Sequence, residues 1–198
     1  MNLVLTSSAS KYFRDYGSAK NRSMEARWEQ CVSNAIGARL IAKRHGKVDP
    51  DRAYTAGLLE NIGHLVLDRF LDEAIEEIRG LALSGTDLIE AERQVLGLHH
   101  AEIGARLSTR WSLPDVLVEV IRHHHDPELA GTDAALAATI HLAEILTQEL
   151  AEPDGPRDLC YSINLKALDL TGLQPDDLGD LCETLEAELV LAKDFISG

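Results

Sequence analysis

Apolar side chains recur every three or four residues along most of the chain, a spacing typical of amphipathic helices. Between Trp28 and Ala42, for example, they fall on one helix face. Ala- and Leu-rich stretches favour helix, and no convincing strand or internal repeat is present. The pattern predicts an all-α fold with helices over residues 2–16, 23–44, 50–61, 65–70, 71–82, 87–98, 99–111, 114–125, 134–150 and 175–196.

Capping residues define the expected helix ends. Ser23 is a candidate N-cap, and Gly46 follows the same helix. Pro50 suits the first turn of the next helix, and Asp87 has capping-box spacing to the acid three residues later. A break is expected at Gly63.

The length of 198 residues allows one large domain or two small ones. Residues 151–162 contain Pro, Gly and Asp and are the best candidate for a linker. We therefore expect a helical domain over residues 1–150. Residues 151–198 are expected to form the linker and a C-terminal helix packed on the same domain.

Composition indicates a soluble globular protein, with 45% hydrophobic and 26% charged residues. The formal net charge of −14 argues against a dedicated nucleic-acid binder. Basic residues gather at one predicted helix end, which we interpret as solvated. They are Arg39, Lys43, Arg44 and Lys47.

Three widely separated cysteines, Cys31, Cys160 and Cys182, form no CxxC pair and suit a reducing compartment. No apolar run approaches the roughly 20 residues of a membrane span, and the first residues are too short for a signal peptide. A cytoplasmic protein without membrane contact is expected.

A polar pair, Glu60-Asn61, interrupts the apolar stretch Ala56–Leu67 and would be costly to bury without partners. Histidines gather elsewhere at predicted helix ends and on one Ala-rich helix. They are His99, His100, His123, His124, His125 and His141. Imidazoles that converge from several helices can bind a transition metal. Adjacent histidines point about 100° apart on a helix, so their clustering alone is a weak signal.

The stretch around Glu60-Asn61 resembles the Leu-Leu-His-Asp-Ile-Gly signature of the HD superfamily, whose His-Asp doublet binds metal. The element Trp111-Ser112-Leu113-Pro114 and Trp28 narrow the resemblance to the HDOD branch, the HD-related output domains of bacterial signalling proteins. We interpret these elements as core packing and a helix start. The resemblance spans Trp28 to about Leu146.

The resemblance implies where metal ligands would stand in this chain. The early His position holds Gln30, the doublet holds Glu60-Asn61, and the late Asp position looks like His141, with Glu144 one turn on. The remaining histidine positions match His100 and the pair His124-His125. His64 stands where related phosphohydrolases often carry Lys, and we interpret it as a partly exposed helix residue.

The resemblance implies an HD-like multi-helix bundle with a C-terminal helical extension, and the replaced ligand positions imply a vestigial pocket. The pocket residues are Gln30, Glu60, Asn61, His64, His100, His124, His125 and His141. A non-catalytic bacterial signalling module is expected, with no metal or other cofactor. The family domain usually has more helices before the Trp28 helix, so an exposed apolar surface is expected. A regulatory protein partner or a second copy would cover it.

Two other functions remain open. One is a metal-dependent phosphohydrolase acting on a nucleotide or phosphate ester. Its divalent transition metal would be held by His100, His124, His125, His141 and Glu60. The other is a ligand sensor whose protonated imidazoles attract a phosphate or cyclic nucleotide near pH 6.

Overall fold

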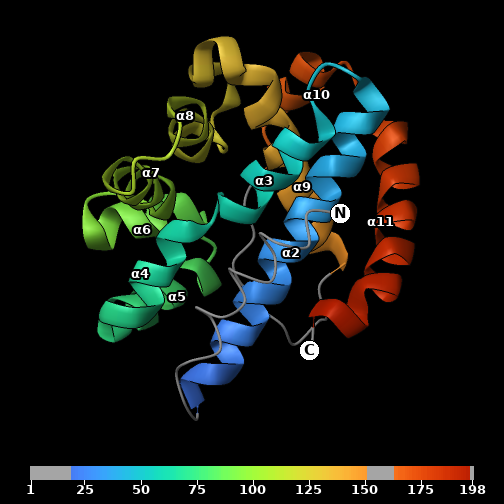
Figure 1. Cartoon of the computed structure of the whole chain (residues 1–198). Coiled ribbons are helices and arrows are strands. Elements are labelled where there is room, and N and C mark those ends of the chain that lie inside the picture. Colours follow the sequence, from blue (N-terminus) through green and yellow to red (C-terminus); the bar gives the residue numbers. More distant parts are fainter. Residues whose placement is uncertain (1–18, 151–162, 197–198) are drawn as a thin grey trace.

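The computed structural model describes residues 19–150 and 163–196 and is helical, with no strand in these ranges. Its α-helices and one 3-10 helix confirm the all-α prediction (Figure 1). The predicted helix over 2–16 and the predicted linker over 151–162 lie outside the described residues. The elements are α2 (Ala19–His45), α3 (Pro50–Leu59), α4 (Ile62–Phe70), α5 (Asp72–Leu83), α6 (Leu88–Leu96), α7 (His100–Arg110), α8 (Asp115–His123), η1 (Pro127–Asp133), α9 (Ala134–Leu150), α10 (Lys166–Thr171) and α11 (Pro175–Ile196).

Helix α2 packs against α3, α9 and α11, while α4 to α8 form the other side of the molecule (Figure 1). The α2 face predicted from the sequence is buried throughout. Large apolar side chains that are less than 2% exposed come from α2, α8, α9 and α11; examples are Ile41, Ile121, Leu136, Ile140 and Leu185. The Ala-rich faces of α2 and α9 let these helices approach closely.

Most predicted helix ends are confirmed. Asp49 caps α3 by accepting hydrogen bonds from the amides of Asp51 and Arg52, with Pro50 in the first turn. Gly46 follows α2 with a φ of +69°. Ser23, however, lies inside α2, which begins four residues earlier at Ala19, so its prediction as an N-cap is wrong.

The break in the polar-pair stretch falls at Glu60-Asn61, not at Gly63, because α4 begins at Ile62. Gly63 has a different role. A Cβ atom at Gly63 would lie 1.9 Å from the carbonyl oxygen of His100. The glycine therefore allows the backbones of α4 and α7 to touch.

The C-terminal helices lie on α2 and α9. Arg44 pairs with Asp177 of α11 at 2.6 Å, and the Lys47 ammonium donates to the carbonyl of Leu170 at 2.9 Å. Part of the predicted solvated basic cluster therefore binds the C-terminal helices. The helices η1 and α10 were not predicted, and the boundary at residue 150 stays a prediction.

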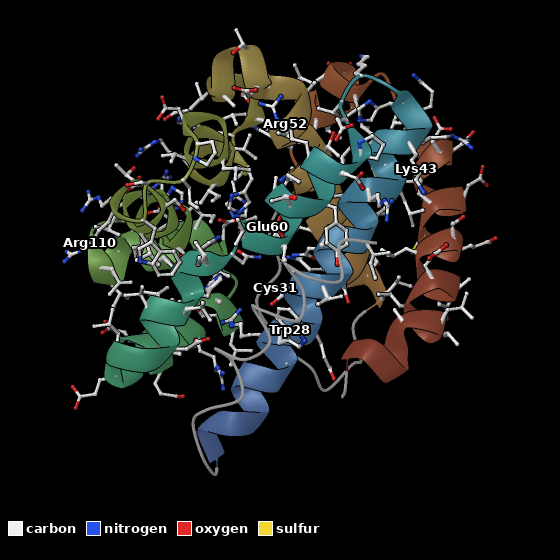
Figure 2. All side chains as sticks on the ribbon, viewed as in Figure 1. Trp28, Cys31, Lys43, Arg52, Glu60 and Arg110 are labelled. Atoms are coloured by element: carbon white, nitrogen blue, oxygen red, sulfur yellow. The ribbon has the colours of Figure 1, made fainter. Side chains whose placement is uncertain are left out.

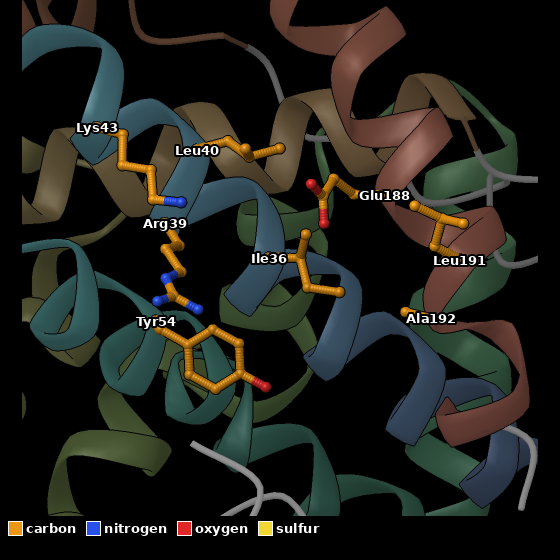
Figure 3. A pocket seen from close by; sticks show the side chains of 8 residues that line it. All are labelled: Ile36, Arg39, Leu40, Lys43, Tyr54, Glu188, Leu191 and Ala192. Atoms are coloured by element: carbon orange, nitrogen blue, oxygen red, sulfur yellow. The ribbon is translucent and has the colours of Figure 1, made fainter. Parts of the chain in front are cut away.

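A pocket of about 160 Å³ lies between α2, α3 and α11 (Figure 3). Ile36, Leu40 and Tyr54 line it together with Lys43 and Glu188. None of its lining residues belongs to the predicted histidine pocket, so the two features are separate.

Within the described residues, the segment Pro127–Leu150 is long and apolar enough to cross a membrane by length and composition, with a mean hydropathy of 1.3. The prediction that no run approaches this length is therefore wrong. In the fold, 61% of an 18-residue stretch of this segment is buried, because α9 is the central core helix. This is compatible with a soluble protein.

Candidate functional site

The structure brings the predicted pocket residues together, with one exception. Glu60 and Asn61 lie between α3 and α4, His100 begins α7, and His124 and His125 follow α8. His141 and Glu144 come from α9. Glu60 lies near the middle of the molecule in Figure 2. The side chains of this histidine–glutamate cluster are buried: Glu60, Asn61, His64, Glu92, His99, His100, His124, His125, His141 and Glu144.

Gln30 does not join the cluster. It is half-buried and accepts a hydrogen bond from Arg27 at 3.4 Å. Asn34, one turn further along α2, is fully buried and donates to Glu60 Oε1. The placement of Gln30 in the pocket is therefore wrong, because the α2 face that meets Glu60 is one turn further on.

His64 is only 4% exposed, so its interpretation as a partly exposed residue is wrong. Its ring stacks on His100 with centroids 4.1 Å apart, and its Nδ1 lies 3.9 Å from Glu92 Oε1. The close approach of α4 to α7 at Gly63 places the His64 ring in the interior of the protein. Trp111 is also corrected, since it is 56% exposed rather than packed in the core.

Hydrogen bonds fix which ring nitrogens hold protons. His124 Nδ1 lies 2.8 Å from the carbonyl oxygen of Ile121, and His100 Nδ1 lies 2.8 Å from Glu92 Oε2. Both oxygens act only as acceptors when Glu92 is ionised, so each Nδ1 carries a proton and donates it into the hydrogen bond. His125 Nε2 lies 3.0 Å from His100 Nε2, so in the absence of an ion one of the two must donate.

The side-chain amides of Asn34 and Asn61 donate hydrogen bonds to the buried carboxyl groups of Glu60 and Glu144. Asn61 Nδ2 donates to Glu144 Oε1 at 2.9 Å. Glu144 Oε2 lies 3.9 Å from His124 Nε2 and 3.8 Å from His125 Nδ1. Thr147 donates to Asn34 Oδ1 and so holds that amide in position beneath Glu60. Glu144, one turn after His141, thus supplies the acidic group that reaches the histidine pair.

The buried glutamates differ in charge preference. Burial raises the pKa of Glu60 well above its usual range, with a further increase from neighbouring Glu144. Burial also raises the pKa of Glu144 to about 7. Burial opposes ionisation of Glu92 too, but the ring and main-chain N–H of His100 outweigh it, and the pKa of Glu92 is lowered.

Burial is the main cause of depressed histidine pKa values. It lowers the pKa of His64, His124 and His125 well below the usual range, and the pKa of His99 and His141 to about 4. These rings are therefore neutral near pH 6. The idea that they attract an anion as imidazolium ions at that pH does not hold.

The donor set fits a divalent transition metal. Glu60 Oε2, His124 Nε2 and Glu144 Oε2 have no hydrogen-bond partner among the described residues. Ligand atoms of His100, His124 and His125 lie within 4.8 Å of one another, as do those of His125, His141 and Glu144. Neutral imidazole and carboxylate are the ligands that zinc, manganese and iron use.

Four residues that contact the site were not predicted as part of it. They are Asn34, Glu92 and Thr147, described above, and Asn164, described below. Each is a polar residue within a helix or loop that carries no distinctive motif. The only sequence signal was a polar residue on a largely apolar face, as for Asn34 between Cys31 and Ala38. That signal also fits many surface positions.

The sequence profile of the HDOD domain matches residues 1–127, which is more than half of the chain. This chain therefore belongs to the HDOD domain family, which confirms the resemblance found in the sequence. The profile ends in η1, so α9 to α11 lie beyond the matched part.

Solved structures agree with this assignment. A candidate signal transduction protein from Marinobacter aquaeolei VT8 is 29% identical, with a TM-score of 0.67 over 85% of this chain and 37% of that one. A candidate phosphohydrolase from Shewanella amazonensis SB2B is 28% identical, with a TM-score of 0.63 over 82% of this chain and 59% of that one.

A protein from Treponema pallidum is 31% identical over 60% of this chain and 24% of its own length. The chain thus spans about a quarter of this relative and less than two thirds of the two solved structures. These similarities support the helical HDOD domain and signal transduction as a broad functional class.

Proposed function

We propose that this chain is a non-catalytic signal-transduction module that acts by protein interaction or by sensing a ligand in its buried cluster. The observation that carries the proposal is the hydrogen bond from Asn61 Nδ2 to Glu144 Oε1. Asn61 stands at the position of the family's doublet Asp, and its neutral amide, whose N–H donates to Glu144, is a poor bridge between two metal ions. Hydrolysis by a two-metal centre needs such a bridging acid.

The burial of the histidine–glutamate cluster also supports a non-catalytic function. Glu60, His100 and His124 are fully buried, so a phosphate ester cannot contact them without a rearrangement. The signal-transduction relative from Marinobacter supports the broad class. We propose that the module is bacterial and cytoplasmic, that it binds a regulatory protein partner or a second copy, and that it does not bind a membrane. A nucleic-acid partner is not proposed, since the net charge is −14.

Metal-dependent turnover of a chromogenic phosphodiester tests this function. The untagged wild type is expected to give no turnover above buffer with Mn²⁺, Fe²⁺ or Zn²⁺. The double variant Glu60→His, Asn61→Asp restores the doublet and is expected to retain more metal, measured by mass spectrometry. Asn61→Asp alone is the matched control. Wild-type turnover that is lost in His124→Ala would contradict the proposal.

A metal-dependent phosphohydrolase is the second candidate, and the unpartnered atoms His124 Nε2 and Glu144 Oε2 favour it. His100, His124, His125 and Glu144 would hold a single ion, with Glu60 beside them. If bound there, such an ion would supply activated water as the nucleophile for hydrolysis. Under this function, Glu144→Gln would abolish both metal retention and turnover, whereas His123→Gln, outside the cluster, would change neither.

A further inference from the structure

The segment of residues 163–166, here called the latch, closes over the histidine–glutamate cluster. The main-chain N–H of Asn164 donates to His141 Nε2 at 2.8 Å. The Asn164 side-chain amide donates to the carbonyl of His125 at 3.3 Å and to Glu128 Oε2 at 3.1 Å. Lys166 pairs with the same Glu128 at 2.6 Å.

The latch also begins α10. Asn164 Oδ1 accepts from the amide of Lys166 at 3.1 Å, and α10 packs on α9 and η1. One residue thus contacts two histidines of the cluster and accepts a hydrogen bond from the first residue of a C-terminal helix. This region lies beyond residues 1–127, the part that the family profile matches.

We propose that binding of a divalent transition metal by His125, His141 and Glu144 opens the latch, and that the closed latch weakens this binding. The inference rests on the proposed function, because it treats the cluster as a regulatory site. It makes α10 the part of the molecule that responds.

The reason is competition for the ring of His141. In the closed state Nε2 must present a lone pair to the Asn164 N–H, so the neutral ring carries its proton on Nδ1. A metal at Nε2 would take that lone pair directly. A metal at Nδ1 would require the proton on Nε2, where it would face the N–H of Asn164. Either nitrogen therefore excludes the closed latch.

The geometry around His141 supports a site of this kind. The three ligand atoms of His125, His141 and Glu144 lie within 4.8 Å of one another. Glu144 Oε2 has no hydrogen-bond partner in the described part of the chain. The same residues can thus exist with a closed latch or with a bound ion.

Titration of the untagged full chain with Co²⁺ tests the proposal, with Mg²⁺ as the control ion because it prefers oxygen ligands. We expect visible absorption from ligated Co²⁺ and, in parallel, faster amide hydrogen exchange over residues 163–171. Mg²⁺ should produce neither. Co²⁺ absorption without a change in exchange over this segment would overturn the latch.

Two substitutions at one position separate its contacts. Asn164→Pro removes the N–H that binds His141, whereas Asn164→Ala keeps it and removes only the side-chain contacts. Losing one competing hydrogen bond should raise Co²⁺ affinity about tenfold in Asn164→Pro relative to Asn164→Ala. Equal affinities in the two variants would contradict the proposal.

Lys166→Ala gives an independent check that leaves His141 and Asn164 unchanged. It removes the ion pair with Glu128 and should speed exchange over residues 163–171 without any metal. An unchanged exchange rate would show that this ion pair does not hold the latch. Phosphodiester turnover by the wild type would instead contradict the proposed function, so the two failures are distinguishable.

Discussion

Two buried glutamates of the cluster, Glu60 and Glu92, have opposite charge preferences at neutral pH. Burial raises the pKa of Glu60 and favours the neutral acid, while His100 lowers the pKa of Glu92 and favours its anion. A glutamine resembles a neutral glutamic acid in shape and hydrogen bonding, but it cannot replace the anion. The same substitution should therefore have different costs at the two positions.

We expect Glu60→Gln to change the free energy of unfolding by less than about 1 kcal/mol, because Asn34 can still donate to the new amide oxygen. Glu92→Gln should cost about 2 kcal/mol, because it removes a charge-assisted bond to His100. Urea denaturation of both variants at pH 7 measures the difference. Equal costs would contradict the assigned charge states.

At the scale of single residues, the sequence predicted the cluster better than its chemistry. Glu60, Asn61 and the histidines were found because a family motif marks them. Asn34 was missed in favour of Gln30, because one helical turn decides which side chain meets Glu60. The burial of His64 was missed because it depends on the contact between α4 and α7, which no local pattern encodes.

Contacts between elements depend on a few glycines, and Gly63 is the clearest case. Its Cα faces the carbonyl of His100, where a Cβ would be 1.9 Å away. Gly80 in α5 offers a matched control, since nothing lies within 4 Å of a Cβ built there. The two positions separate the steric effect of a methyl group from its effect on helix propensity.

Gly63→Ala should lower the free energy of unfolding by about 3 kcal/mol, because α4 and α7 must move apart. Gly80→Ala should raise it by up to about 1 kcal/mol through helix propensity alone. Thermal denaturation of the two variants provides the test. A stable Gly63→Ala protein with an unchanged cluster would show that the α4–α7 contact tolerates a methyl group.

At the scale of elements, most helices were predicted because the apolar spacing is regular and the caps at Asp49, Asp87 and Gly46 are strong local signals. The helices η1 and α10 were missed. Both are short, so they contain too few turns for an apolar period to show. The break at Glu60-Asn61 was placed two residues late, because Gly63 looked like the more flexible position.

The whole molecule should become less stable in acid. Burial lowers the pKa of His99 and His141 to about 4, and the pKa of His64, His124 and His125 well below the usual 6.5. Between these values the unfolded chain binds more protons, so the stability present above pH 6.5 is lost as the pH falls towards 4. Glu60 and Glu144 oppose this trend with raised pKa values, but they are fewer.

We expect the melting temperature to fall by at least about 5 °C between pH 6.5 and pH 5. Above pH 6.5 it should level off or decline, as Glu144 ionises near its raised pKa of about 7. His141→Gln should make the acid loss less steep. Calorimetry across this range checks the prediction, and a melting temperature that rises towards pH 5 would contradict the neutral, buried state of these rings.

The unequal burial of the two tryptophans has a spectroscopic consequence. Trp28 is 6% exposed on α2, and Trp111 is 56% exposed at the end of α7. The chain contains no other tryptophan, so its intrinsic fluorescence consists of one blue-shifted, shielded emitter and one red-shifted, accessible emitter. Acrylamide, a neutral quencher that the net charge of −14 does not repel, will remove the second signal first. The fluorescence that remains comes from Trp28 and reports on α2. The two native tryptophans therefore report separately on the two sides of the molecule.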